Sequence, residues 1–482
     1  MARGKLDRTA FRRGSGDLLY LAPYRQVRVY NHDTETLATG YTLQTGGVAI
    51  TYPLVADRNG RYSAWFESGM YDLDDGSRGA RIVWTADDGV EAAGGGGAES
   101  AEVAVMKEAP LNVRWPEFGA SGRNVGDDTP KIQAAIDKVA AQTGVMGTLG
   151  GEIYIPPGSY IVNGQLNIPG GISLRIFGGG VGTGFGIGSP ERGKITTLIR
   201  TTAYADTSKV MIKGDGSVGR IALTLEKMVL DGKFGAGITN AAELLYIRKS
   251  NALTLRDLLF VDHSDTGLRP SVKLANAFNA TVDNCWFHNL GYNTTPNAAG
   301  LHGNGAGLAI VEGTVTLKVS NCEWEGNLGT DIYIGHPSAV SGVTFSNIKM
   351  ERGQTNTTAA WPYIWLGNCQ AISFDNLALS HFRQVAAIKQ TGVSSVPNQF
   401  SNLMLTRPAA SSGYATGNYF VEVDAGSMMF MNTYVSDPAP GIAYFKVAAA
   451  VGDFKFLGMV DNPAILKNDL RAGANTRWVT SP

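Results

Sequence analysis

The segment Val282-Asp283-Asn284-Cys285-Trp286-Phe287 is the clearest copy of a phrase that recurs down the middle of the chain. We call its polar third residue the pivot. Other copies have their pivots at Lys227, Asp257, Asn321, Asn347, Asn376 and Asn402. Successive pivots are 26 to 30 residues apart, with one interval of 37. A repeat of this length is typical of stacked supersecondary units, so the sequence predicts a solenoid.

The pattern inside each copy indicates the kind of solenoid. Apolar residues stand two before, one after and three after the pivot, and also four before it in six of the seven copies. Strict alternation is the period of a half-buried strand, and a one-residue slip at the pivot indicates a bend between two strands. Asn suits such a bend because it tolerates left-handed backbone angles, and stacked Asn side chains can bond to one another. We therefore expect an all-β chain built on a right-handed parallel β-helix with the apolar columns inside.

Composition narrows the function classes. Of 482 residues, 17% are charged and the formal net charge is −1, which gives no support for binding to nucleic acid. Three cysteines exclude a disulfide framework, and Cys285 and Cys322 share an inward column where small buried thiols are expected. No stretch approaches the roughly 20 apolar residues of a membrane helix, so no membrane insertion is expected. The first residues, Met1 to Arg13, lack the apolar core of a secretion signal.

The sequence divides into five parts. We expect an N-terminal arm at 1–20, a small β-rich module at 21–80 with a hairpin turn at Asn59-Gly60, and a Gly-rich linker at 81–112. The β-helix should span 113–410, followed by terminal coils and a C-terminal cap at 411–482. Near its start, Thr129-Pro130 begins an amphipathic helix that would cover the open end of the apolar interior, with one face formed by Ile132, Ala135, Ile136, Val139 and Ala140.

Two segments resemble known families. The first comprises Glu117-Phe118-Gly119-Ala120, Gly126-Asp127-Asp128-Thr129, Ile132-Gln133-Ala134-Ala135-Ile136 and Ile155-Pro156-Pro157-Gly158-Ser159-Tyr160. It resembles the opening segment of the pectate-lyase-like β-helix superfamily, in the version found in phage tailspikes and glycan depolymerases. The chain departs from that pattern at Ser121-Gly122-Arg123-Asn124, where Gly-Asp-Gly is common. The second segment, residues 53–73, resembles a small module of phage minor tail proteins.

These resemblances imply a homotrimeric virion protein that acts at the exterior of the host cell. They imply that the N-terminal module contacts tail or baseplate proteins and that the β-helix meets a host surface glycan. Neither resemblance supplies a catalytic motif, because active sites in this superfamily move from protein to protein.

Candidate catalytic residues lie four positions after the pivots. Adjacent coils stack about 4.7–4.9 Å apart, so Glu325 and Glu351 should be neighbours, with His288 alongside. Two close carboxyl groups can act as acid and base or nucleophile in glycan cleavage. Asp331 lies nearby in sequence and joins the candidates. The competing interpretation is a set of solvated surface charges bridged by Lys349 or Arg352.

Candidate substrate-binding residues come from three places. Trp286 and Glu323 stand two positions after their pivots, in an outward column apolar enough to suggest a trimer interface as well. An insertion between Gly291 and Gly313 is either a recognition loop or a trimer contact and carries Tyr292, His302 and Asn304. A loop after Phe260 carries Asp262, His263 and Asp265, which would bind a cation or sugar hydroxyls, or form a hydrated turn.

The sequence therefore supports three functions. The first is a phage tail protein that recognises, and in one version depolymerises, a host polysaccharide as a hydrolase or a lyase. The second is a structural or adhesive tail protein without catalysis, and the third is a free carbohydrate-active enzyme. No cofactor and no metal centre are predicted, and no motif indicates a bound divalent cation.

Overall fold

The computed structural model describes strands between residues 3 and 86, and then the path from 110 to 480 except for gaps between strands. The gaps are 142–149, 182–194, 202–208, 233–241, 264–268, 291–305, 328, 336–337, 352–360, 381–385, 407–418, 437–442, 449–450, 461–466 and 470–476. The chain forms two compact units, Met1–Val103 and Ala104–Pro482.

The first unit is built from antiparallel strands. β1 (Arg3–Thr9) pairs with β7 (Arg61–Glu67), which also pairs with β5 (Gly40–Tyr41). A second sheet has the order β6 (Leu54–Val55), β4 (Gln26–Asn31), β8 (Gly69–Asp74) and β9 (Ile82–Ala86), and β2 (Phe11–Arg13) pairs with β3 (Leu19–Leu21). The segment expected to be an arm therefore contributes a paired strand, and β9 carries the module into the expected linker. The predicted turn Asn59-Gly60 lies outside the described residues.

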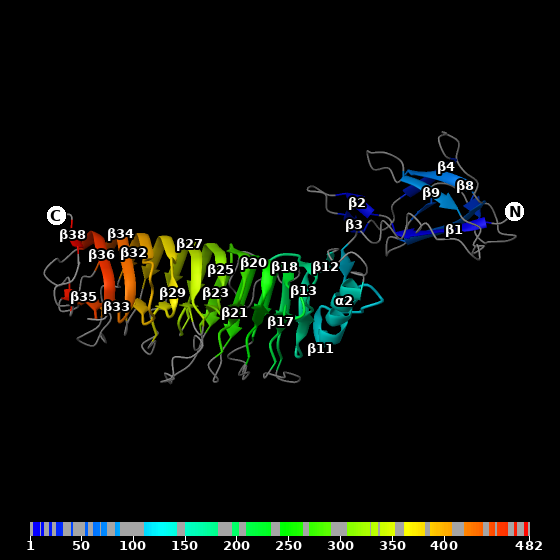
Figure 1. Cartoon of the computed structure of the whole chain (residues 1–482). Coiled ribbons are helices and arrows are strands. Elements are labelled where there is room, and N and C mark those ends of the chain that lie inside the picture. The colour runs from blue at the N-terminus through cyan, green and yellow to red at the C-terminus, as the bar shows by residue number, and fades with distance from the viewer. Residues whose placement is uncertain are drawn as a thin grey trace. The chain divides into compact units, whose positions relative to one another are not determined.

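The second unit is a solenoid in which every pairing between described strands is parallel, as Figure 1 shows. The pivot sheet contains the strands on both sides of the pivots: β10 (Leu111–Asn112), β11 (Arg123–Asp127), β12 (Gly151–Ile155), β13 (Gly158–Ile161), β15 (Ser173–Gly178), β16 (Thr196–Ile199), β18 (Ile221–Asp231), β20 (Ser250–His263), β22 (Phe278–Asp283), β23 (Trp286–Leu290), β25 (Val315–Glu325), β27 (Val340–Glu351), β29 (Cys369–Gln370), β30 (Ser373–Ser380), β32 (Asn398–Thr406), β34 (Gly426–Ser436), β36 (Val451–Val460) and β38 (Arg477–Thr480).

The short-strand sheet closes each coil on the other side. Its members are β14 (Leu166–Ile168), β17 (Ile212–Asp215), β19 (Leu245–Arg248), β21 (Val272–Ala275), β24 (Leu308–Val311), β26 (Ile332–Ile334), β28 (Ile364–Leu366), β31 (Ile388–Gln390), β33 (Tyr419–Val423), β35 (Ala443–Val447) and β37 (Lys467–Asp469). The predicted right-handed parallel β-helix is confirmed.

The pivots are the bends that the sequence predicts. All seven, together with Asn432 in the next coil, have φ between 48° and 60°, in the left-handed region. One residue in this conformation turns the strand without breaking the parallel ladder, and it also shifts the phase of the side chains. That shift places residues at two before, one after and three after the pivot on the same inner wall.

The pivot side chains form the predicted ladder for part of its length. Amide groups donate to the pivot of the previous coil from Asn284 to Asp257 (2.7 Å), from Asn347 to Asn321 (3.0 Å), from Asn376 to Asn347 (2.8 Å) and from Asn432 to Asn402. At two steps the acceptor is the carboxylate one residue before the pivot: Asn321 donates to Asp283 and Asn402 donates to Asp375. There the carboxylate of the neighbouring column replaces the pivot side chain as the acceptor.

The large aromatic side chains inside the solenoid occupy one corner in some coils and another corner in the following coils. Three residues after the pivot, the rings of Phe260, Phe287 and Trp324 stack at 5.1 and 4.5 Å between centroids. From the next coil onward the rings move to two residues before the pivot, where Phe345, Phe374, Phe400 and Phe430 stack at 4.3, 4.7 and 5.0 Å. Aliphatic residues occupy the other corner each time, because a coil of fixed cross-section holds one large ring in this layer.

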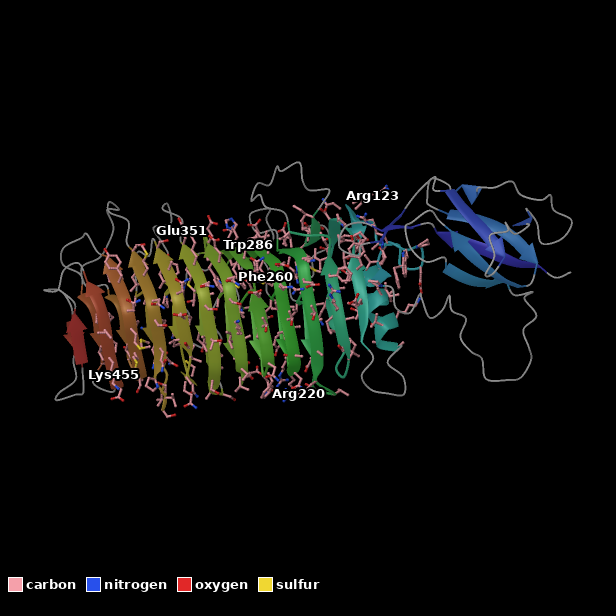
Figure 2. All side chains as sticks on the ribbon, turned by 90° about the horizontal axis from the view of Figure 1, so that it is seen from above. Arg123, Arg220, Phe260, Trp286, Glu351 and Lys455 are labelled. Atoms are coloured by element: carbon pink, nitrogen blue, oxygen red, sulfur yellow. The ribbon has the colours of Figure 1, made fainter. Side chains whose placement is uncertain are left out.

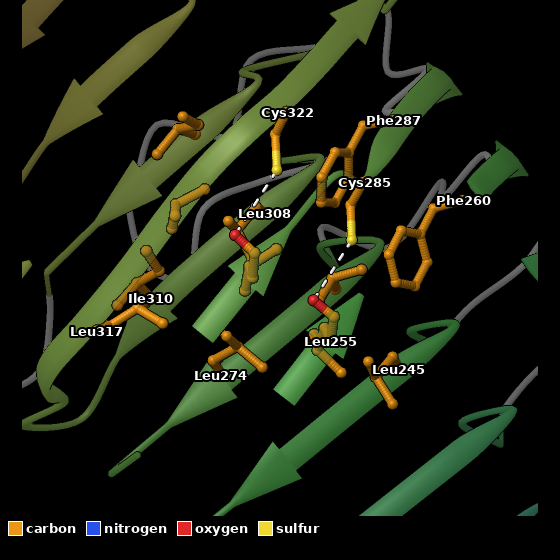
Figure 3. Close-up of a cluster of buried hydrophobic side chains, with 14 of the residues drawn as sticks. Leu245, Leu255, Phe260, Leu274, Cys285, Phe287, Leu308, Ile310, Leu317 and Cys322 are labelled. Atoms are coloured by element: carbon orange, nitrogen blue, oxygen red, sulfur yellow. Dashed lines mark hydrogen bonds between the residues drawn. The ribbon is translucent and has the colours of Figure 1, made fainter. Parts of the chain in front are cut away.

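The cysteines are reduced and buried. Figure 3 shows Cys285 and Cys322 in the same inward column, each beside a backbone carbonyl of the preceding coil, Leu255 O at 3.7 Å and Val282 O at 3.8 Å. Burial raises the pKa of Cys285, and the Cys322 thiol beside it acts in the same direction. Both behave as small hydrophobic residues, as the sequence predicts.

The capping helix α2 (Thr129–Ala141) covers the first coils with its predicted face, of which Ile132, Ala135 and Ile136 are fully buried. Its N-terminus is capped by Asp127, whose carboxylate accepts bonds from the Thr129 backbone NH at 2.9 Å and from its hydroxyl at 2.6 Å. The Thr129 hydroxyl in turn accepts from Gly164 NH at 3.1 Å, which fastens the helix to the solenoid.

One corner of each coil is variable. We call it the connector edge. In each coil it lies between the last residue of the pivot-sheet strand and the first residue of the short-strand-sheet strand that follows it along the chain. In sequence, 17 residues lie between Leu290 and Leu308 and 12 between Glu351 and Ile364, whereas at the opposite corner a single residue separates Arg248 from Ser250. Long connections on a rigid scaffold commonly carry binding residues, so this edge is where a site is expected.

We expect Asn347→Ala to lower the free energy of unfolding by about 2–3 kcal/mol, because alanine is strained at this φ of 55° and two ladder bonds are lost. Asn347→Gly should cost roughly 1 kcal/mol less, since glycine adopts left-handed angles without strain. Chemical denaturation of both variants checks this, and equal losses would contradict the role of the bend.

Because the large ring occupies only one of the two corners in each coil, substitutions at the two corners should have strongly coupled effects on the free energy of unfolding. Val319→Phe alone should destabilise by about 1–3 kcal/mol through overpacking, and Trp324→Met alone by a similar amount through a cavity. The double variant copies the next coil, which has Phe345 and Met350, and should lose less than the sum of the single changes. Strict additivity in denaturation midpoints would show that the two corners do not share a volume.

Candidate functional site

The predicted catalytic column lies in register on the outer face of the pivot sheet. His288 pairs with Glu325 across β23 and β25, and Glu325 pairs with Glu351 across β25 and β27. Two residues closer to the pivot, Trp286, Glu323 and Lys349 form a parallel column on the same strands. We call these six residues the acidic patch. All except the exposed Lys349 are half-buried, and Figure 2 labels Trp286 and Glu351 along one edge of the solenoid.

Lys349 bridges two of the carboxylates. Its ammonium group donates to Glu323 Oε1 at 2.6 Å and lies 3.2 Å from Glu351 Oε2. The hydrogen bond with Glu323, followed by that with Glu351, raises the pKa of Lys349, so the bridge carries a positive charge throughout the physiological range. The Lys349 bridge that the surface-charge interpretation names is therefore present at Glu351, and Glu323 shares it.

Glu325 is different from its neighbours. Among the residues that the structure describes, no donor or cation is paired with its carboxylate. It stands between His288 on one side and Glu351 on the other, at the last position of β25, directly before the connector edge. An uncommitted carboxylate beside an ion-paired one is an arrangement that acid–base chemistry can use.

Two predicted site residues lie inside the protein instead. His263 is 0% exposed and Asp331 is 1% exposed, so neither reaches a ligand on the outer face. The cause at His263 is a second left-handed bend, at Asp262 with φ 53°, which reverses the phase of the strand and turns the next residue inward. Asp331 follows the corner after β25, where its carboxylate accepts a bond from Asn327 Nδ2 at 2.8 Å.

Asp262 belongs to a ladder of its own. Its carboxylate accepts a bond from Asn289 Nδ2 at 2.7 Å, and Asn289 has φ 52° at the equivalent position of the next coil. The side chain is therefore committed to the stack. Asp265, Tyr292, His302 and Asn304 lie outside the described residues, so their roles stay predictions.

The sequence analysis missed an aromatic cluster on the other side of the connector edge. The outward column of the short-strand sheet runs in register through Tyr246, Lys273, Ala309, Tyr333 and Trp365. Trp361 stacks on Trp365 at 5.8 Å, and Trp365 donates to the Thr391 hydroxyl at 3.0 Å. Trp365 is half-buried, whereas Tyr333 is 2% exposed and packs in a small apolar cluster with Ala275, Ala306, Ala309 and Val311.

A sequence signal for this column did exist. Short apolar-X-apolar triplets such as Ile332-Tyr333-Ile334 and Ile364-Trp365-Leu366 recur once per coil. Three residues are too short to stand out by periodicity unless the pivots have already set the frame.

No helix within the described residues is long and apolar enough to cross a membrane. Across the same described ranges, no group of three or more His, Cys, Asp or Glu side chains is arranged to hold a metal ion.

Comparison with known proteins agrees with the fold. Residues 111–189 match the family described as rhamnogalacturonase A/epimerase, pectate lyase-like. The chain is 27% identical over 231 residues to mannuronan C5-epimerase AlgE1 of Azotobacter vinelandii, which covers 42% of this chain and 16% of that protein. The chain thus spans a small part of the length of this relative.

Solved structures give weaker likenesses. ORF18 of Geobacillus virus E2 is 17% identical with a TM-score of 0.49, covering 80% of this chain and 68% of that chain. A tailspike protein of E. coli bacteriophage HK620 in complex with a hexasaccharide is 11% identical with a TM-score of 0.46, covering 78% and 65%. From the matched segment and the parallel coils that continue from it, this chain carries a pectate-lyase-like β-helix domain.

Proposed function

We propose that this chain is a bacteriophage tail protein whose β-helix binds a polysaccharide of the host cell surface along the connector edge and cleaves it at the acidic patch. The observation that carries the proposal is the Glu325 carboxylate, which has no ion-pair or hydrogen-bond partner among the described residues and lies between His288 and Glu351, beside the Trp286 column. The sequence matches support the substrate class, because the names of the matched family and of the epimerase both refer to polysaccharides.

The patch suggests how the roles divide. Glycoside cleavage commonly uses one carboxyl group to protonate the leaving oxygen and a second to attack the sugar or to activate water. Glu351 forms an ion pair with Lys349 and suits the second role. Glu325, which has no cation among the described residues, suits the proton donor. Trp286 offers an apolar face on which a sugar ring can stack.

The tail location and the homotrimer are parts of the same proposal. The N-terminal segment resembles a module of phage minor tail proteins, and it would dock the chain on tail or baseplate proteins. Apolar side chains remain exposed on the outer face of the last coils, with Met404 at 49%, Tyr434 at 40% and Leu457 at 51%. A solvent-facing patch of this kind supports contact between subunits, and sedimentation of the full chain at three times its monomer mass would agree with it.

A non-catalytic adhesin is the second candidate function. The observation that favours it is the Lys349 bridge, which commits two of the three patch carboxylates to ion pairs. Incubating the full chain with purified capsular and lipopolysaccharide preparations separates the two. Shortened oligosaccharides indicate a depolymerase, and unsaturated ends among them indicate a lyase. Binding without cleavage of the polysaccharide indicates an adhesin. Absence of binding to every preparation from a host of the phage would contradict both candidate functions.

We expect Glu325→Gln to lower the cleavage rate by roughly 10²–10⁴-fold while binding is kept, because the proton donor is removed with little change in shape. The matched control is Glu117→Gln, which removes a surface carboxylate paired with Lys138 on the cap. Cleavage that survives in Glu325→Gln would move the active site elsewhere even if the function stands.

Trp286→Ala should weaken binding of the same polysaccharide by about 1 kcal/mol or more, roughly fivefold in Kd, since an aromatic contact is lost. Phe278→Ala is the control, because Phe278 is a partly exposed ring at the opposite corner of the coil, where it packs on Arg220. Titration by calorimetry measures both, and equal weakening would show that binding does not depend on the patch.

A further inference from the structure

His263 is a buried imidazole next to the connector edge. It is the last residue of β20 and is 0% exposed. The residues around it begin two consecutive strands of the short-strand sheet: Ala242 precedes β19 and Ser271 precedes β21. One side chain therefore lies where two neighbouring coils return from the connector edge.

The imidazole bonds to both return points. Its Nε2 lies 3.0 Å from the carbonyl oxygen of Ala242, and its Nδ1 lies 2.9 Å from the hydroxyl of Ser271. Backbone bonds join the same places, since Leu244 NH donates to Ser271 O at 2.9 Å. A carbonyl can only accept, so Nε2 carries a proton; in the neutral ring Nδ1 then accepts from the Ser271 hydroxyl, whereas in the charged ring Nδ1 would donate to it.

A second proton is poorly accommodated here. It would make Nδ1 a donor and force the Ser271 hydroxyl to turn, and it would place a charge in the dry interior. Burial lowers the pKa of His263 to about 4, although the bond to Ala242 acts in the opposite direction and Arg200 adds to the lowering.

Among the described residues on the surrounding elements, the charged groups include Arg200, Glu243, Arg269 and Asp231. Arg200, after β16, is itself 0% exposed and donates to the carbonyl oxygen of Lys209. Glu243, beside Ala242, lies 3.7 Å from Arg269, which approaches from the start of β21. Asp231, at the end of β18, is 8% exposed and belongs to the preceding coil.

We propose that His263 is an acid-sensitive latch: neutral, it holds the first residues of β19 and β21 on the stack, and protonated, it releases them. These strands carry Tyr246 and Lys273 of the aromatic column, so release would loosen that side of the connector edge. The consequence for a glycan rests on the proposed function, but the latch itself does not.

The direction follows from linkage. The latched state disfavours the proton, so its stability is complete above the ordinary pKa of about 6.5 and is lost as the pH falls toward about 4. If the released imidazole titrates normally, the released population rises on the order of 100-fold between pH 7 and pH 4.

Hydrogen exchange measured by mass spectrometry on the full chain, without any glycan, tests this. After correction for intrinsic exchange rates, wild-type segments 242–248 and 271–275 should lose protection by at least tenfold at pH 4 relative to pH 7. The internal reference is β32, in a distant coil. Loss of protection in all coils alike, or in none, would overturn the latch.

Two variants sharpen the test. His263→Gln cannot be protonated and should show no acid response in the two segments. Ser271→Ala keeps the buried imidazole and its bond to Ala242, so it should retain the response in segment 242–248, whereas segment 271–275 loses its contact with the latch. A response that persists in His263→Gln refutes the proposal. If His263→Gln does not fold, C2 proton exchange of the wild-type imidazole decides: a pKa near 6.5 refutes the latch, and one near 4 supports it. Failure of the glycan assays leaves each of these outcomes unchanged.

Discussion

The structure depends on in-register parallel stacking of coils that all bend at one left-handed residue. Because the bend recurs at the same place, each side chain lies above its counterpart in the previous coil, about 4.8 Å away. Like then stacks on like. Inside, this produces the aromatic columns and the exchange of bulk between two corners. On the outer face, in-register stacking places each charged side chain next to the side chain at the equivalent position of the neighbouring coil.

Outward charges are therefore arranged in compensated columns. Glu226 is 0% exposed between Arg175 and Arg256; burial works to raise its pKa, but the bonds from the two guanidinium groups prevail and lower it. Glu422 is held in the same way by Lys446 and Lys389 on the short-strand sheet. Like charges placed directly opposite each other are destabilising, so an uncompensated one stands out. Glu325 beside Glu351 is such a like-charge pair, and only Glu351 has a cation partner among the described residues.

The two flanks of the connector edge carry different sets of side chains. One flank ends the pivot-sheet strands with the acidic patch, and the other begins the short-strand sheet with the aromatic column. Under that edge lie buried polar groups, among them Arg200, His263, Asn327 and Asp331, which hold the returning chain in place. A solenoid can vary its connections at such an edge while its columns stay fixed, which explains why the family resemblance predicts the fold but no catalytic residue.

The sequence by itself determined the coil. The alternation around Asn284, Asn321 and Asn347 specified the inward columns, the bend and the pairing of Glu325 with Glu351, because these follow from local geometry repeated without change. Three features depend on contacts between distant parts of the chain, so only the tertiary structure shows them. The second bend at Asp262 turned His263 inward, and the strand β1 joined a sheet with residues far along the chain. Lys349 pairs with Glu323 and Glu351 and not with Glu325. This pairing depends on how far the side chains reach between coils, which the order of residues within one coil does not specify.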